Sequence, residues 1–393
     1  MEFFEQKYYT ISKSILKLSG VWPFQPLWLK YVLATFIVCA YVSLLIPQLN
    51  CYIKLWDEGV DKIMVRTLPL LTTLVYGTKF MTCFLNAEKI KSILMNMKSH
   101  SDLLSTENEF NEFLKYCQRG RECTKIYVGY VFFTTCLYVF MPLVPCLLDQ
   151  IHPLNETRER VFIYELDYGF DNNEDYFYII QLHIYITAYV KISSGFNFDV
   201  LFFLFTQHAC GYFAALGQKL ENLDKKIPKE KHSIEKEYDI VHQEISTCVQ
   251  RHCTGLEFLS VIESLFAISF LIQILITVVI ISLIGILVIM NLDKPHEAVR
   301  FVLFVVAHSF SLFYVSLSSQ RLTDKISLLF KNVYFCRWYE LPIKSRKMIL
   351  QILTKTKYTY KITALQIYSI EIESFSVMIR ASMSYFTMLS SMR

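Results

Sequence analysis

The C-terminal segment of this 393-residue chain carries the most conspicuous chemistry. When it is projected on a helix at 100° per residue, its polar residues form one stripe. The stripe consists of Glu373, Ser376, Arg380, Ser384, Thr387 and Ser391. The bulky apolar residues Phe375, Ile379, Phe386 and Leu389 lie largely on another face. Polar groups inside a membrane face water or a partner, so the stripe fits either a pore wall or a helix–helix interface.

Arg380 is the unusual member of this stripe, because its charge would repel cations in a pore. Two arrangements would remove the difficulty. In one, Arg380 pairs with Glu373, two turns earlier and close to the same face. In the other, Arg380 lies in a wide, wet region, where salt screens its field over about 8 Å.

A second set of residues suits a small-ligand site. Aromatic and small polar side chains recur in the outer halves of the apolar segments: Thr72, Thr73, Tyr76, Tyr138, Met141, Tyr185, Tyr189, Phe304 and His308. Tyr185 and Tyr189 are four residues apart and share one face of a helix. The set predicts an apolar cavity with a few hydrogen-bonding groups, and ordinary helix packing is the alternative for each residue.

Patterns typical of enzymes and metal sites are missing from the sequence. There is no Gly-rich phosphate loop, no HExxH and no GxSxG, and the histidines lack the spacing of metal ligands or of a catalytic triad. We therefore expect no catalytic residues, no cofactor and no metal. The net charge of +4 is too small to indicate nucleic acid as a partner.

The composition indicates a membrane protein. Hydrophobic residues make up 53% of the chain and charged residues only 19%, below the quarter or so that is usual for soluble domains. The apolar residues occur in runs long enough to cross a bilayer. We predict an amphipathic surface helix over residues 1–20, followed by seven membrane-crossing helices. The crossings are expected at residues 28–47, 63–85, 126–148, 176–216, 258–290, 298–316 and 362–389.

The loops give the orientation. Lysine and arginine concentrate in alternate connections, including the polar stretches 86–125 and 319–361. By the positive-inside rule these connections are cytoplasmic, so the N-terminus is expected inside and the C-terminus outside. The glycosylation sequon at Asn155 then falls on the outer side, as glycosylation requires. The fourth apolar stretch is too long for one perpendicular crossing, and we interpret it as one long helix that leaves the membrane on the inner side.

Over essentially its whole length the chain resembles the insect odorant receptor family. The motif Gly20-Val21-Trp22-Pro23 precedes the first crossing as in that family, and Asp199 and His208 lie in a similarly long fourth helix. The strongest likeness is the run YFCRWYELP from Tyr334, which includes Trp338 and resembles the cytoplasmic anchor segment of the family. Ser384-Tyr385-Phe386-Thr387 and Leu389 resemble the end of its pore helix.

The resemblance implies a tetrameric, ligand-gated, non-selective cation channel. It implies a ligand-binding bundle over residues 1–318, an anchor segment over 319–361 that includes Tyr334 and Trp338, and a pore helix over 362–393. The residues that it places at the pore are Glu373, Arg380, Ser384, Thr387, Ser391 and Met392. Implied partners are a small volatile odorant, the lipid bilayer and permeant cations, and the implied location is the plasma membrane of olfactory sensory neurons.

Two departures from the family's shared coreceptor suggest an odorant-tuning subunit that assembles with it. The coreceptor carries a long insertion after the fourth helix, whereas residues 217–257 are short here. The coreceptor's Val-Gln-Leu at the end of the pore helix is replaced by Ser390-Ser391-Met392. The resemblance thus implies a heterotetramer, with Ser391 at the polar position and Met392 at the apolar gate.

Three other seven-helix or multi-helix classes fit less well. A G-protein-coupled receptor would have its N-terminus outside, an Asp-Arg-Tyr after the third helix and an Asn-Pro-x-x-Tyr in the seventh, and the sequence has neither motif. A gustatory receptor would end in Thr-Tyr, four apolar residues and Gln-Phe. A transporter would show two repeated halves with paired broken helices, which this sequence lacks.

Overall fold

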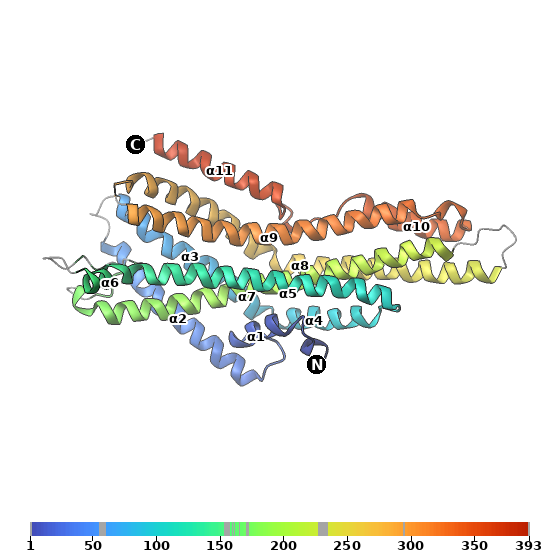
Figure 1. The fold of residues 1–393 in the computed structure, drawn as a ribbon, viewed down its shortest axis with the longest axis horizontal. Coiled ribbons are helices and arrows are strands. Elements are labelled where there is room, and N and C mark those ends of the chain that lie inside the picture. The colour runs from blue at the N-terminus through green and yellow to red at the C-terminus, as the bar shows by residue number, and fades with distance from the viewer. Residues whose placement is uncertain are drawn as a thin grey trace.

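Long helices that run roughly along one axis make up most of the protein (Figure 1). This computed structural model describes residues 2–54, 60–152, 158, 160, 162–164, 166–169, 173–226, 235–293 and 295–391. The α-helices are α1 (Thr10–Leu18), α2 (Leu27–Lys54), α3 (Val60–Leu85), α4 (Ala87–Asp102), α5 (Glu107–Phe140), α6 (Val144–Ile151), α7 (Phe177–Lys226), α8 (Glu235–Met290), α9 (Pro295–Phe335), α10 (Ile343–Lys357) and α11 (Ile372–Ser391). Short 3₁₀ turns are η1 (Glu2–Glu5), η3 (Met141–Leu143), η4 (Asn173–Tyr176) and η5 (Trp338–Glu340), and the strands are β1 (Thr363–Ala364) and β2 (Tyr368–Ser369).

Six of the described helical segments are long and apolar enough to cross a bilayer. They correspond to α2, α3, α5 continued into α6, α7, α8 and α9. The seventh predicted crossing, α11, is not among them, because Glu373, Arg380 and its serines lower its mean hydropathy. The prediction of an all-α membrane fold is confirmed.

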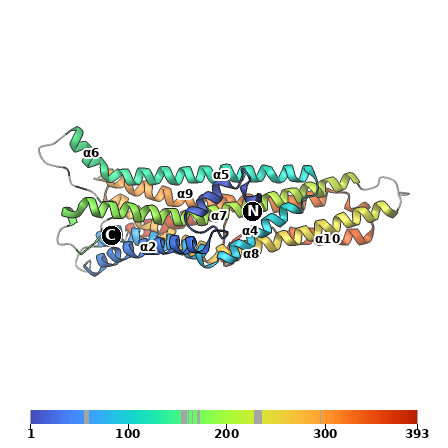
Figure 2. The same cartoon turned by 90° about the horizontal axis from the view of Figure 1, so that it is seen from below.

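Several helices continue well past the predicted crossings. The third crossing was expected from residue 126, but α5 begins at Glu107, and α8 begins at Glu235 rather than near 258. The boundary expected after residue 318 falls inside α9, which runs unbroken to Phe335. Hydropathy marks where a helix becomes polar, whereas the helix itself continues into water. The extensions of α8 and α9, with α10, form the end of the bundle opposite α6 in both views (Figures 1 and 2).

The last crossing begins later than predicted. Residues 363–369 form a small antiparallel hairpin, in which Thr363 pairs with Ser369, and α11 starts only at Ile372. The turn places Leu365 and Gln366 at positive φ of 53° and 59°. Glu263 of α8 accepts hydrogen bonds from the Tyr360 hydroxyl group and from the backbone N–H and hydroxyl group of Thr363. These long-range contacts stabilise the hairpin where the sequence alone predicts helix.

The core lies around α7, whose apolar span is almost entirely buried. α7 contacts α3, α5, α8 and α9, and its prediction as one long helix is confirmed. Phe198 and Phe202 pack edge-to-face against Phe266 and Phe270 of α8, with ring centroids 4.8–5.3 Å apart. Aromatic side chains on both helices therefore hold α8 against the central helix.

The N-terminal segment forms η1 and α1 instead of one helix over residues 1–20. α1 ends at Leu18, and Gly20 adopts a φ of 71°, while the N–H groups of Val21 and Trp22 donate to the Leu16 carbonyl. A residue with positive φ after a helix favours glycine. This turn buries Trp22 to 2% exposure against Phe4, which accounts for the Gly-Val-Trp-Pro motif.

Candidate functional site

A buried cavity lies between α3, α5, α7 and α9, and we call it the bundle cavity. Its volume is about 100 Å³. The lining is largely aromatic and aliphatic with a few polar groups: Thr72, Tyr76, Tyr127, Tyr130, Val131, Thr134, Thr135, Leu137, Tyr138, Tyr164, Lys191, Ile192, Phe196, Leu303, Phe304, Ala307, His308 and Ser311. A concave apolar space with convergent polar groups is the usual form of a small-ligand site.

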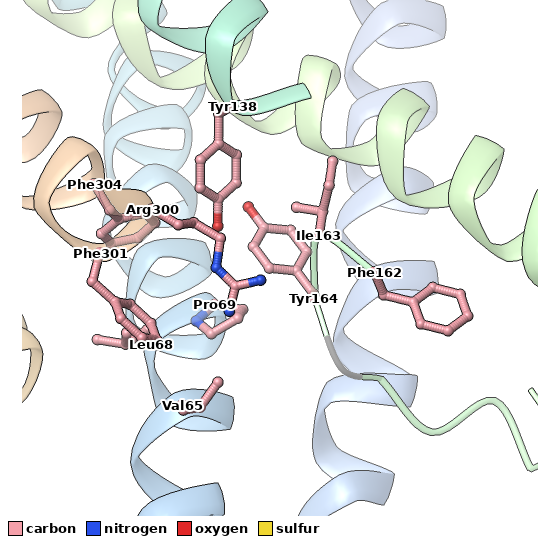
Figure 3. Close-up of a pocket in the computed structure, with 10 residues that line it drawn as sticks. All are labelled: Val65, Leu68, Pro69, Tyr138, Phe162, Ile163, Tyr164, Arg300, Phe301 and Phe304. Carbon is pink, nitrogen blue, oxygen red and sulfur yellow. The ribbon is translucent and has the colours of Figure 1, made fainter. Parts of the chain in front are cut away.

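A smaller pocket of about 30 Å³ adjoins the bundle cavity (Figure 3). The two share Tyr138, Tyr164 and Phe304 as lining residues. The Tyr138 ring centroid lies 5.9 Å from that of Phe304 and 6.3 Å from that of Tyr164, so these three rings separate the two spaces. In Figure 3 the Arg300 side chain points into this pocket, below the Tyr138 ring. The smaller pocket is therefore an adjoining, aromatic-lined pocket at the end of the bundle where α9 begins.

Lys191 supplies a cationic group in the cavity wall. Its side chain is 2% exposed, and its Nζ donates to Thr72 Oγ1 at 3.2 Å and to the Tyr164 hydroxyl oxygen at 3.3 Å. The same Nζ lies 4.9 Å from the Tyr164 ring centroid. Burial raises the pKa of Tyr164 well above its usual range, so this hydroxyl group stays neutral.

A buried ion pair lies directly behind the cavity lining. Lys79 of α3 and Asp199 of α7 each have 1% exposed side chains, with Nζ–Oδ distances of 2.8 and 2.9 Å. Two lining residues contact the same carboxylate, the Tyr127 hydroxyl group at 2.5 Å and Ser311 Oγ at 3.3 Å. A ligand that displaces Tyr127 or Ser311 would therefore perturb the charge pair and the hydrogen-bonded network around it, which joins four helices.

Five of the nine predicted ligand residues come together in this cavity: Thr72, Tyr76, Tyr138, Phe304 and His308. The His308 ring lies 4.8 Å from Phe304 and 6.2 Å from Tyr76, centroid to centroid. Aromatic residues from α3, α5 and α9 thus meet although they are far apart in sequence.

The other four predicted residues lie elsewhere. Tyr189 is 67% exposed, and the hydroxyl group of Tyr185 donates to the Val139 carbonyl outside the cavity. Thr73 bonds to Gln48 and to the Pro69 carbonyl, and Met141 lies in the turn η3. The structure does not place Tyr185 or Tyr189 among the residues that line the bundle cavity. Lys191, Ile192 and Phe196 are the α7 residues on the cavity side.

The ligand prediction omitted Lys191 and Tyr164, which line the cavity. The sequence contains a recognisable sign of function for the first but not for the second. Lys191 interrupts an apolar run, and an ionisable residue within a membrane helix is itself a sign of function. Tyr164 belongs to the connection between α6 and α7 and reaches the cavity only through the tertiary fold. No local pattern would have identified it.

The helix α11 packs on α8 and α9 by one face only. Met378 and Ser382 are buried, the Phe375 ring lies 5.6 Å from Phe313, and Phe386 packs onto Gly285. The predicted pore residues Glu373, Arg380, Ser384, Thr387 and Ser391 are all exposed on the opposite side. Among the described side chains Arg380 and Glu373 do not pair with each other, so the first of the two arrangements for Arg380 is not present within one chain.

Three remaining predictions concern the loops and the C-terminus. Asn155 and Met392 lie outside the described residues. In the anchor segment Tyr334 is 54% exposed, whereas Trp338 packs half-buried against the core. Within the described part of the chain, no cluster of three or more His, Cys, Asp or Glu side chains is arranged to hold a metal ion.

Comparison with known proteins gives consistent matches. A family model described as 7tm Odorant receptor matches residues 60–383. The chain is 20% identical over 404 residues to Odorant receptor 13a of Drosophila melanogaster, an alignment that covers 96% of this chain and 93% of that protein.

Two solved structures share the fold. The insect olfactory receptor OR5 from Machilis hrabei superposes with a TM-score of 0.79 at 14% identity, covering 100% of this chain and 99% of that one. The same receptor in complex with eugenol gives a TM-score of 0.78 at 13% identity, covering 99% and 98% of the two chains. At this identity the likeness concerns the fold.

Proposed function

Because the chain belongs to the 7tm odorant receptor family, we propose that it is an odorant-tuning subunit of a ligand-gated, non-selective cation channel. The family is one of multi-pass membrane receptors and not of enzymes. The proposed stimulus is a small, volatile, mostly apolar molecule. The proposed partners are copies of the family's coreceptor, in a heterotetramer at the plasma membrane of olfactory sensory neurons.

The bundle cavity is the observation that carries the ligand proposal. It is enclosed by four helices and lined mainly by aromatic and aliphatic side chains. Burial of apolar surface contributes roughly 25 cal/mol per Å², before the costs of association, so a small apolar ligand gains most of its affinity from this lining. The receptor in the eugenol complex has the same fold and binds a small odorant, which supports the same kind of ligand for this chain.

The exposed stripe of α11 supports the channel part of the proposal. Five polar or charged residues face away from the chain's own bundle, although apolar packing holds the opposite face. A polar line on a membrane helix needs water or a partner. Four such helices around one axis would supply a wet pore, with Ser391 and Met392 at the proposed outer gate.

The proposed topology places the N-terminus in the cytoplasm and the C-terminus outside. The supporting observation is the excess of lysine and arginine in alternate connections. Epitope tags at both ends, stained in intact and permeabilised cells, test it. Staining of an N-terminal tag on intact cells would reverse the topology.

Patch-clamp recording tests the function as a whole. Cells that express the chain with a coreceptor should show odorant-evoked cation currents for some members of a panel of volatile compounds. Cells with the coreceptor alone are the control for currents that do not depend on this chain. If odorants bind the purified protein but no current follows, the channel proposal is wrong while the receptor proposal stands.

A further inference from the structure

Lys191 places a cationic side chain in the lining of the bundle cavity, whose other described residues are uncharged. Among the described lining residues of the bundle cavity and the adjoining pocket there is no Asp or Glu, whereas Lys191 lines the first and Arg300 the second. Asp199, behind the lining, is held by Lys79 at 2.8 Å. The charged side chains that the structure describes in the two linings are therefore cationic.

Within the described part of the chain, Lys191 uses two of its three hydrogen-bond donors. An ammonium group has three N–H donors. Two of them go to the neutral hydroxyl oxygens of Thr72 and Tyr164, which also line the cavity. No described residue accepts from the third donor, and the wall beside it is built from side chains such as Ile192 and Phe196.

A buried cation with only neutral partners is costly in free energy. An oxygen acceptor on the ligand would offset that cost, and a hydrogen bond between charged and neutral groups contributes more than one between two neutral groups. The aromatic lining can pack against the carbon skeleton of a ligand. The cavity therefore suits a ligand that has one polar group and an apolar skeleton.

We propose that Lys191 makes the cavity selective for odorants with a carbonyl or carboxylate oxygen on an apolar skeleton, this oxygen accepting a hydrogen bond from the lysine ammonium group. The inference rests on the proposed function, because it assigns the ligand class of the same cavity. It adds a residue that discriminates among ligands by their functional group and not by their size alone.

The test compares ligands with one carbon skeleton that end as an alkane, an alcohol, a ketone or a carboxylic acid. Binding to purified protein is measured as ligand-induced thermal stabilisation, and currents are recorded in parallel. A hydrogen bond to a charged group contributes about 1.5–3 kcal/mol, which corresponds to roughly 10- to 100-fold in affinity. We expect the ketone or the acid to bind at least tenfold more tightly than the alkane. Lys191→Met should remove this difference and leave alkane binding intact.

Two further variants complete the design. Thr72→Val removes one hydroxyl partner of the ammonium group and should weaken binding of ketone and acid only partly. Lys125→Met removes an exposed lysine paired with Glu122 and should change nothing. A preference for the acid over the ketone would identify a charge pair, and the reverse would identify a neutral acceptor; both support the proposal.

Other outcomes overturn it. If Lys191→Met weakens alkane and ketone binding equally, Lys191 has only a structural role. If the wild-type protein binds all four ligands with equal affinity, the cavity does not discriminate between functional groups. The proposed receptor function is then unaffected. If the ketone binds selectively but evokes no current, the inference about Lys191 holds and the channel proposal fails.

Discussion

At the scale of single residues, the Lys79–Asp199 ion pair lies buried within the membrane bundle. Both side chains are 1% exposed, and the pair joins α3 to α7. Removing one partner of a buried pair leaves a charge in a low-dielectric core and costs about 3–5 kcal/mol. Asp199→Asn and Lys79→Met should each strongly reduce surface expression and lower the unfolding temperature in detergent.

The double variant Lys79→Met/Asp199→Leu separates charge from packing. It removes both charges, while Tyr127 and Ser311 keep their mutual hydrogen bond of 3.0 Å. We therefore expect it to be more stable than either single variant. Loss of the Lys125–Glu122 pair, which is exposed and screened by water and salt, is the control and should change the stability little. A double variant as unstable as the singles would show that the pair matters through its shape and not its charge.

The environment of His100 in α4 should make the stability of the fold depend on pH. Its ring stacks on Tyr212 at 4.4 Å and on His208 at 5.6 Å. Burial, and secondarily the charge of Arg251, lower the pKa of His100 to about 4. Because this pKa is depressed from about 6.5 in the unfolded chain, the folded state binds fewer protons between these pH values. The contribution of neutral His100 to the free energy of unfolding is present above about pH 6.5 and disappears as the pH falls towards about 4. This change amounts to roughly 3 kcal/mol.

Thermal unfolding of the detergent-solubilised protein between about pH 7 and about pH 4.5 measures this dependence, because that range covers most of the interval between the two pKa values. His100→Phe keeps an aromatic ring in the stack and removes the titrating group, so the unfolding temperature should fall less steeply with acid. His152→Phe, at the exposed end of α6, is the matched control, and its unfolding temperature should depend on pH as that of the wild type does. Equal slopes for wild type and His100→Phe would exclude His100 as the source.

At the scale of elements, the approach of α3 to α7 sets the size of the bundle cavity. A Cβ atom on Gly195 of α7 would overlap the ring of Tyr76, which lines the cavity from α3. Gly195→Ala should therefore push the Tyr76 ring towards His308 and reduce the cavity volume. Larger ligands should lose potency before smaller ones.

A homologous series of ligands of increasing chain length measures this effect. The largest members should shift by tenfold or more, about 1.4 kcal/mol, while the smallest change little. Gly129→Ala in α5 is the control, because its added Cβ would meet nothing within 4 Å while the gain in helix propensity is the same. A uniform loss of response across the series would point to misfolding instead of a smaller cavity.

The elements also show how far sequence patterns reach. Runs of apolar residues predict α2, α3, α7 and α9 as membrane helices because hydrophobicity is a local property. The hairpin before α11 depends on Glu263, about a hundred residues earlier, so a helix was expected there instead. In the cavity, spacing shows that Tyr185 and Tyr189 share a face, but only packing against other helices decides whether that face points inward.

At the scale of the whole molecule, the chain is an elongated bundle whose C-terminal helix lies on one side of it (Figure 1). The C-terminus lies at the end near α6, while the N-terminus lies near the middle of the long axis in both views (Figures 1 and 2). The bundle cavity lies in the half that contains α6, and α10 lies at the other end. The bundle cavity and the end formed by α10 are therefore separated along the axis, and α9 runs between them without a break.

The last prediction concerns the surface of α11 that no described part of this chain covers. If four copies surround a pore, cysteines substituted for Ser384 and Thr387 should react with a water-soluble thiol reagent during odorant application, while cysteines substituted for Ser382 and Phe386 should not. Ser382 is fully buried and Phe386 packs on Gly285, whereas Ser384 and Thr387 are exposed. The wild-type chain, with its own 11 cysteines, gives the background rate.

Arg380 makes the same experiment sensitive to charge. It is exposed one turn before Ser384 and is not paired with Glu373, so its field acts on the proposed pore over about 8 Å at physiological salt. An anionic reagent should therefore react with the thiol of the Ser384→Cys variant faster than a cationic one of equal size. The difference should shrink when Arg380→Gln is added and at high salt. Reaction at Phe386→Cys and Ser382→Cys, with Ser384→Cys and Thr387→Cys protected, would make the stripe a contact between subunits and place the pore elsewhere.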